Sequence, residues 1–225
     1  MVRLGGPELS TGRPASDAAD RLLAGAGGTA AEHQRPITRM GTLTITGGTL
    51  RSRRVSTPSG RAVRPTPARV KEALFSILGA RVVDARVLDL FAGSGALGFE
   101  SLSRGASHVT FVEKHGPTAE GLRSAAKALG VEERVDVIAA PAERAVHGVA
   151  GRFDLVFADP PYALPYPRAA FATLRSRAAI DARTTVVYEH SARDEAPADP
   201  AMPLARSERY GEVALAFLHP IASAA

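Results

Sequence analysis

The sequence predicts an α/β fold: a doubly wound, mostly parallel sheet of seven strands, preceded by an N-terminal β-hairpin and a helix. Short apolar runs alternate with helical patterns from residue 86 onward, as in parallel sheets covered by helices. A glycine-rich turn follows the first of these runs. The 225 residues, 45% of them hydrophobic, are enough to fill one core.

The first 40 residues are rich in Gly, Ala, Thr and Ser and show little hydrophobic periodicity. We expect residues 1–40 to be a disordered extension. They contain no apolar stretch typical of a secretory signal, and their acidic residues argue against an organellar transit peptide.

Residues 41–80 are predicted to form a hairpin and a helix. Alternating apolar residues flank Gly47-Gly48, which predicts a β-hairpin over 42–57. Thr66 is a suitable N-cap and Pro67 a suitable first helical residue. The following apolar stripe is expected to be buried, with Gly79 ending the helix; its members are Val70, Ala73, Leu74, Ile77 and Leu78.

Residues 81–221 are predicted to hold the main sheet. Five apolar runs indicate its parallel strands, and two later runs on either side of Tyr210-Gly211 indicate an antiparallel hairpin at its edge. The predicted strands are 86–90, 108–113, 135–139, 153–158, 184–189, 204–209 and 213–219.

Positive charge is concentrated in residues 41–80, which carry seven Lys or Arg and one acid, a local balance of +6. The rest of the chain sums to −1, so this segment is a candidate surface for nucleic-acid phosphates. The candidate RNA-binding residues are Arg51, Arg53, Arg54, Arg61, Arg64 and Arg69.

Other classes of site are disfavoured by composition. The chain has no cysteine, so disulfides and thiolate metal sites are excluded, and its six histidines show no metal-ligand spacing. No apolar run reaches the length of a membrane span. We expect a cytoplasmic monomer without a metal.

A cofactor site is predicted where the first two strands of the main sheet end. Asp89 ends the first strand, a glycine-rich turn follows, and Glu113 ends the next strand, where a carboxylate can accept both hydroxyls of a ribose. Gly93-Ser94-Gly95-Ala96-Leu97-Gly98 also fits the nicotinamide fingerprint. Asp89 suits the ammonium of a methionine moiety better than a pyrophosphate, so S-adenosyl-L-methionine is favoured over NAD.

A catalytic motif is predicted after the strand at 153–158, in Asp159-Pro160-Pro161-Tyr162. An exocyclic amine is a poor nucleophile until acceptors bind its hydrogens. Asp159 offers a carboxylate, and the turn at Pro160 can present a carbonyl oxygen. The ring of Tyr162 can stack on a base. A simple strand-ending turn would also account for this tetrapeptide, but an apolar, buried strand before it favours a ligand site.

These motifs, together with one further block, resemble one family over residues 42–219. The block is Arg64-Pro65-Thr66-Pro67-Ala68-Arg69-Val70-Lys71-Glu72-Ala73-Leu74-Phe75. It is the bacterial 16S ribosomal RNA (guanine(966)-N(2))-methyltransferases, of the Rossmann-like class I S-adenosylmethionine-dependent fold. The family pattern has Asp where Ala68 stands.

The resemblance implies transfer of a methyl group to the N2 of one guanine of 16S rRNA, within an assembling 30S subunit. It assigns catalysis to Asp159, Pro160, Pro161 and Tyr162. It implies cofactor binding by a larger set: Asp89, Phe91, Ala92, Gly93, Ser94, Gly95, Glu113, Lys114, Ala142 and Glu143. Within that set, Ala142 and Glu143 would lie at the adenine and Glu113 at the ribose.

Three alternatives stay open at the level of sequence. A DNA amino-methyltransferase shares Asp-Pro-Pro-Tyr, although the chain lacks a target-recognition domain. A protein-glutamine methyltransferase typically has Asn where Asp159 stands. A non-catalytic rRNA-binding assembly factor would not need the intact loop and acceptors. The residues alone do not choose between guanine N2, adenine N6 and cytosine N4.

Overall fold

The computed structural model describes residues 40–58, 67–161 and 164–221. The predicted N-terminal extension therefore lies outside the described residues, as do Arg61, Arg64 and Tyr162.

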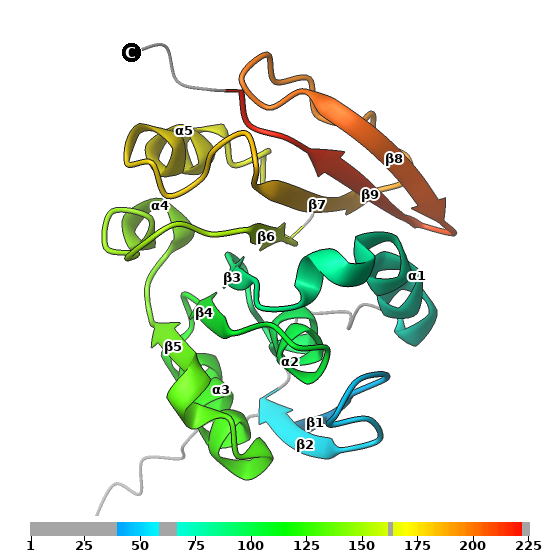
Figure 1. Cartoon of the computed structure of the whole chain (residues 1–225), viewed down its shortest axis with the longest axis vertical. Helices are drawn as coiled ribbons and strands as arrows, with labels where there is room; N and C mark the ends of the chain where they lie inside the picture. Colours follow the sequence, from blue (N-terminus) through cyan, green and yellow to red (C-terminus); the bar gives the residue numbers. More distant parts are fainter. Residues whose placement is uncertain (1–39, 59–66, 162–163, 222–225) are drawn as a thin grey trace, which may run out of the picture. The chain divides into compact units, whose positions relative to one another are not determined.

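A seven-stranded sheet forms the centre of the described chain, in the order β5-β4-β3-β6-β7-β9-β8 (Figure 1). Five strands are parallel, and β9 and β8 run antiparallel at one edge. The strands are β3 (Arg86–Asp89), β4 (His108–Val112), β5 (Val135–Ile138), β6 (Leu155–Ala158), β7 (Thr185–Ser191), β8 (Leu204–Tyr210) and β9 (Val213–Leu218). The predicted fold class is confirmed.

Helices pack on both faces of the sheet and divide the core in two. The helices of one face are α1 (Ala68–Leu78), α2 (Ala96–Ser103) and α3 (Gly116–Leu129), whose apolar residues cluster with those of β3, β4, β6 and β7. Those of the other face are α4 (Ala142–Ala145) and α5 (Arg168–Ser176). Short 3-10 turns occur at Gly79–Val82 and Glu132–Arg134. The turns after β3, β4 and β6 thus lie together at the carboxyl edge of the sheet.

The N-terminal hairpin pairs β1 (Met40–Thr44) with β2 (Arg54–Pro58), as predicted, and these strands form a small sheet of their own. Leu43, Ile45 and Val55 are buried and belong to the same core cluster as α1, α2 and α3. The structure thus joins residues 41–80 to residues 81–221 through one core, and the domain boundaries drawn from sequence stay a prediction.

Helix α1 begins one residue later than predicted. Pro67 occupies the N-cap position and Ala68 is the first helical residue, so the capping role expected of Thr66 falls outside the described residues. Gly79 ends the helix as predicted, with a φ of 53°. The buried face also differs, because Ala73 and Ile77 are only half-buried whereas a lysine and a phenylalanine, Lys71 and Phe75, are buried.

Lys71 is buried because a second charge, Glu100 of α2, lies beside it. Glu100 is 0% exposed, and its Oε2 lies 3.7 Å from Lys71 Nζ. Lys71 Nζ also donates to the Thr44 carbonyl at 2.9 Å. Burial lowers the pKa of Lys71, and the Glu100 carboxylate opposes that shift.

The same carboxylate binds the hairpin and its own helix. Thr46 donates to Glu100 from its backbone N–H and its hydroxyl, both at 2.8 Å. Arg104, one turn along α2, donates from Nε at 2.9 Å and places its guanidinium 4.9 Å from the centre of the Phe75 ring. Glu100 is therefore a buried junction of hairpin, α1 and α2.

The turn of the hairpin rests on the carboxyl end of α2. Ser103 accepts from Thr49 N at its carbonyl (2.7 Å) and from Leu50 N at its hydroxyl (2.8 Å). A side chain at Gly48, where φ is +76°, would overlap the backbone carbonyl of Ser103. Close contact between this turn and α2 consequently requires glycine there.

Candidate active site

Three carboxylates lie at the carboxyl ends of neighbouring parallel strands: Asp89 on β3, Glu113 just after β4 and Asp159 just after β6. The strand order places β3 between the other two. In open α/β sheets, ligands bind outside this edge where the connections diverge. The structure thus brings together the acids predicted for the cofactor and for catalysis.

Asp89 is 3% exposed, and its Oδ2 accepts a hydrogen bond from Gly98 N in α2 at 3.2 Å. Burial raises the pKa of Asp89 to about 7; the Gly98 N–H opposes this, and the charges of Asp159 and Glu113 add to it. A cationic group bound here would replace the water that this carboxylate has lost. The site therefore fits the ammonium of a methionine moiety.

Glu113 already has two backbone donors. Its Oε2 accepts from Gly93 N at 2.9 Å, and its Oε1 accepts from His115 N at 2.8 Å. The carboxylate thereby fixes the glycine-rich turn against the end of β4. Each carboxylate oxygen has a further lone pair for a diol, so these bonds are compatible with the ribose contact predicted from sequence.

Asp159 lies at the end of a fully buried strand, followed by buried Pro160 and exposed Pro161. Burial raises the pKa of the Asp159 carboxyl, and its charge in turn acts on Asp89 and on Tyr188 of β7. Tyr162 lies outside the described residues, so its stacking on a base stays a prediction.

The glycine turn between β3 and α2 has Ala92 and Gly93 buried and Phe91 and Ser94 half-buried. Gly95, with a φ of +77°, is the N-cap of α2. A side chain on Gly98 would overlap the Phe111 ring of β4, so glycine lets α2 pack closely on the sheet.

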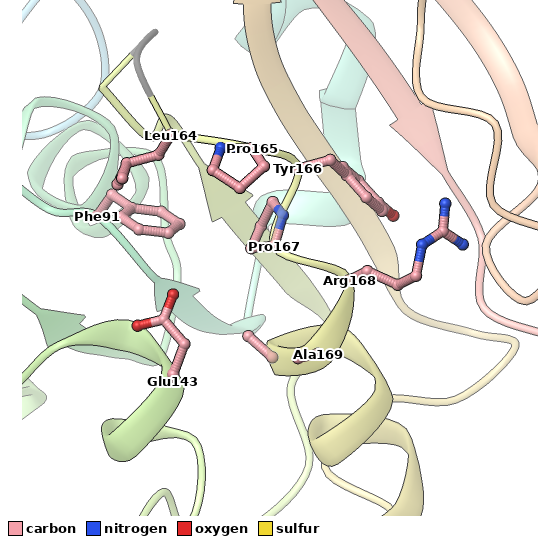
Figure 2. A pocket seen from close by; sticks show the side chains of 9 residues that line it. Phe91, Glu143, Leu164, Pro165, Tyr166, Pro167, Arg168 and Ala169 are labelled. Carbon is pink, nitrogen blue, oxygen red and sulfur yellow. The ribbon is translucent and has the colours of Figure 1, made fainter.

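A cavity of about 190 Å³ opens beside this turn, between Phe91 and Glu143 on one side and the segment from Leu164 to Ala170 on the other. In Figure 2, Pro165 and Pro167 lie across from Phe91 and Glu143. Phe91 and Glu143 were both predicted to bind cofactor, and the cavity brings them together. Ala142 is instead 5% exposed and packed in the core, and Lys114 is exposed on the turn after β4.

Sequence reasoning missed the cavity wall from Leu164 to Ala170. An aromatic group supports it: the Tyr166 ring lies 5.4 Å from Phe171 and 5.2 Å from Tyr188, and the Arg168 guanidinium lies 5.6 Å from the Tyr166 ring. Arg168 also pairs with Asp199 at 2.9 Å. The prolines at positions 165 and 167 were the available signal of a non-helical segment.

The candidate RNA-binding arginines that the structure describes fall into two groups. Arg51, Arg54 and Arg69 are exposed. Arg53 is exposed as well, but its guanidinium donates to the Ala128 carbonyl in the last turn of α3 at 3.1 Å. Arg53 therefore has a structural bond in addition to any role in RNA binding.

The sequence relationships agree with this geometry. The family described as Conserved hypothetical protein 95 matches residues 43–219. The chain belongs to this family. Family membership confirms the resemblance stated from the motifs, and the match runs from the hairpin to the end of the sheet.

Two similar proteins carry names that refer to rRNA methylation. A candidate rRNA methyltransferase of Bacillus subtilis, YlbH, is 33% identical over 177 residues, covering 77% of this chain and 96% of the relative. The Escherichia coli protein named Ribosomal RNA small subunit methyltransferase D is 49% identical over 73 residues, covering 32% of this chain and 37% of the relative.

Several solved structures have a fold similar to that of this chain. A candidate methyltransferase of Escherichia coli, YhhF, superposes with a TM-score of 0.72 at 30% identity, covering 81% of this chain and all of that one. A Thermus thermophilus protein, TTHA0928, superposes with a TM-score of 0.65 at 31% identity, covering 79% and 99% of the two chains. An RNA methyltransferase of Salinibacter ruber, solved with S-adenosyl-L-homocysteine, shares the fold at 16% identity, with a TM-score of 0.53 and 69% and 94% of the chains covered.

Membrane spans and metal sites are both absent from the part of the chain that the structure describes. There, no helix combines the length and the apolar character that crossing a membrane requires. Within the same residues, His, Asp and Glu side chains form no group of three or more suited to a metal ion.

Proposed function

We propose that this chain is an rRNA methyltransferase that transfers a methyl group from S-adenosyl-L-methionine to the exocyclic N2 of a guanine in 16S rRNA, the guanine-966 type. The observation that carries the proposal is the meeting of Asp89, Glu113 and Asp159 at one sheet edge in a member of this family. The names of the relatives support rRNA of the small subunit as substrate.

The cofactor would supply an electrophilic methyl group on a sulfonium. Asp89 would bind its ammonium, Glu113 its ribose hydroxyls, and the turn from Phe91 to Gly95 would lie against its methionine portion. The cavity between Phe91 and Glu143 has room for the adenine, whose flat ring can stack on Phe91. Ala142 would form part of the floor below it, and Lys114 would flank the ribose.

Asp159 would accept one hydrogen of the target amine, and the carbonyl at Pro160 would accept the other. These bonds would turn the nitrogen lone pair out of conjugation with the base, and they would strengthen as positive charge develops on nitrogen. The N–C bond would form as the S–C bond of the sulfonium breaks, releasing S-adenosyl-L-homocysteine, and the alkylated amine would lose one proton to the Asp159 carboxylate or to water. A strong base is not required, since the amine becomes acidic on alkylation. Positioning of the two reactants at one sheet edge would also contribute to the rate.

Replacement of Asp159 by Ala is expected to reduce methyl transfer by about 10²- to 10³-fold, because an acceptor used in the transition state is lost. The measurement is incorporation of labelled methyl into naked 16S RNA, 30S subunits and duplex DNA, with the modified nucleotide mapped. Calorimetry with S-adenosyl-L-homocysteine checks that the variant still binds ligand.

Asp136→Ala is the matched control, because Asp136 is exposed at the start of β5 and pairs with His108. This variant should keep normal activity. Methylation of duplex DNA alone by the unsubstituted protein would contradict the proposal in favour of a DNA amino-methyltransferase. Absence of ligand binding would favour a non-catalytic assembly factor.

A further inference from the structure

Glu189 is a buried carboxylate near the end of β7 that the motifs do not include. It is 6% exposed, in a strand whose preceding residues are all buried. Glu189 has an interaction within the chain, and the two oxygens of a carboxylate offer several lone pairs, so this side chain can accept a further hydrogen bond from a ligand. Its position relative to Asp159 indicates where such a ligand would lie.

The register of β3, β6 and β7 places Glu189 beside Asp159. Asp89 pairs with Phe157, and Phe157 pairs with Val187, so these three residues form one row across the sheet. The pairing of β6 with β7 ends at Ala158 and Tyr188. Asp159 and Glu189 are the next residues, Asp159 just after the end of β6 and Glu189 within β7. Adjacent strands are about 4.8 Å apart, which sets the scale of their separation.

The face is identified by the packing on either side. Phe157 and Val187 belong to the cluster that includes α1 and α2, whereas Ala158 and Tyr188 belong to the opposite cluster. Since side chains alternate along a strand, Glu189 shares the face of Val187, which is also the face of Asp89. Figure 1 shows β6 and β7 side by side, with β7 the longer strand.

From this placement we propose that Glu189 is a specificity-determining residue: its carboxylate accepts the N1–H of the target guanine while Asp159 and Pro160 hold the N2 amine. The inference rests on the proposed function. Along its pairing edge, guanine presents donors at both N1 and N2. Adenine and cytosine present an amine beside a ring nitrogen that is an acceptor.

Two neighbouring carboxylates therefore match guanine and mismatch the other two bases. A ring nitrogen lone pair facing the Glu189 carboxylate would leave both acceptors without a donor, which is the costly case for a buried polar group. Sites built around such a hydrogen bond reject analogues that lack it. Glu189 would thus supply the choice of base that Asp159 does not make.

The decisive comparison uses 16S RNA assembled by ligation with either guanine or 2-aminopurine at the mapped target position. 2-Aminopurine keeps the exocyclic amine but has an acceptor at N1. We expect the unsubstituted protein to methylate guanine on the order of 10- to 100-fold faster than 2-aminopurine, the range for one hydrogen bond to a charged group.

In Glu189→Gln, the side-chain amide can donate to the N1 of 2-aminopurine, so the preference should fall to within a few-fold or reverse. Glu120→Gln, an exposed change on α3, is the control and should leave the preference unaltered. A merely structural role for Glu189 would alter thermal unfolding and both rates together, without moving their ratio.

Several outcomes overturn the inference. One is an unsubstituted protein that methylates both bases equally, a result that does not depend on whether any variant folds. Another is a Glu189→Gln protein with the original preference. Failure of the proposed function would be recognised differently, because guanine in 16S RNA would then receive no methyl group from the unsubstituted protein.

Discussion

At the scale of single residues, Asp89 combines burial with acidic surroundings. The charges that act on it are those of Asp159 from β6 and Glu113 from β4, and its hydrogen-bond donor is the Gly98 N–H of α2. Burial raises the pKa of Asp89 to about 7, close to neutral pH; the Gly98 N–H opposes this shift and the two charges add to it. Ionisation of Asp89 is then linked to binding of a cationic ligand.

Binding of S-adenosyl-L-methionine should weaken as pH falls, because protonation of Asp89 removes the charge that pairs with the ligand ammonium. With the pKa of Asp89 at about 7, the dissociation constant should rise roughly tenfold from pH 7.5 to pH 6. Calorimetry over this range measures it. Asp89→Asn should bind more weakly at pH 7.5 and show a flatter profile; a flat profile in the unsubstituted protein would refute this linkage.

Sequence predicted the residues whose position follows from a strand end. Asp89, Glu113 and Asp159 each follow an apolar run, and parallel strands bring such ends together. Glu189 was the last residue of the predicted strand 184–189, and nothing local distinguished it from a strand-ending surface acid. Only the register of β6 and β7, which ends at Ala158 and Tyr188, shows that Asp159 and Glu189 both follow the last pair of these strands.

At the scale of elements, the junction at Glu100 connects three segments that are distant in sequence. Glu100 contacts Thr46 of the hairpin, which is 54 residues away in sequence, Lys71 in α1, and Arg104, one turn along α2. The sequence did not predict this junction, because a lysine and a glutamate in separate helical patterns each look like surface residues. Their burial depends on tertiary pairing, which hydrophobic periodicity does not describe.

Glu100→Ala should lower the free energy of unfolding by about 3–5 kcal/mol, because it leaves Lys71 buried without its partner. Urea unfolding followed by circular dichroism measures this. Glu120→Ala removes an exposed carboxylate that pairs with Arg123 on α3, and should change stability by no more than about 0.5 kcal/mol. Equal effects of the two substitutions would show that Glu100 does not stabilise the junction.

At the scale of the whole molecule, alternation of strands and helices was enough to predict the seven-stranded sheet, since each apolar run became a strand in the expected order. The uneven distribution of charge was equally visible, with the +6 balance confined to residues 41–80. Charge distribution along the sequence does not show what this segment binds, because binding depends on which side chains are exposed. Arg51 and Arg54 are exposed, so their replacement tests the binding directly.

The double variant Arg51→Gln with Arg54→Gln should bind 16S RNA more weakly and with less dependence on salt. Loss of two phosphate contacts should reduce the slope of log affinity against log salt by about 1.4–1.8. Filter binding between about 50 and 200 mM salt, two concentrations at which such contacts separate, measures the slope. Arg183→Gln, an exposed change in the turn before β7, should leave it unchanged; an equal loss there would mean that the binding is not local to the hairpin.

The contact between the hairpin turn and α2 also limits how the chain can be engineered. The turn around Gly48 fits the backbone of Ser103, and Thr46 requires the carboxylate of Glu100. Grafting residues 40–58 onto another methyltransferase would therefore fail unless Glu100, Ser103 and Arg104 were transplanted with them. The unit that can be exchanged between enzymes is the hairpin together with the helix that carries the glycine turn, so these two parts would have to be inherited as one piece.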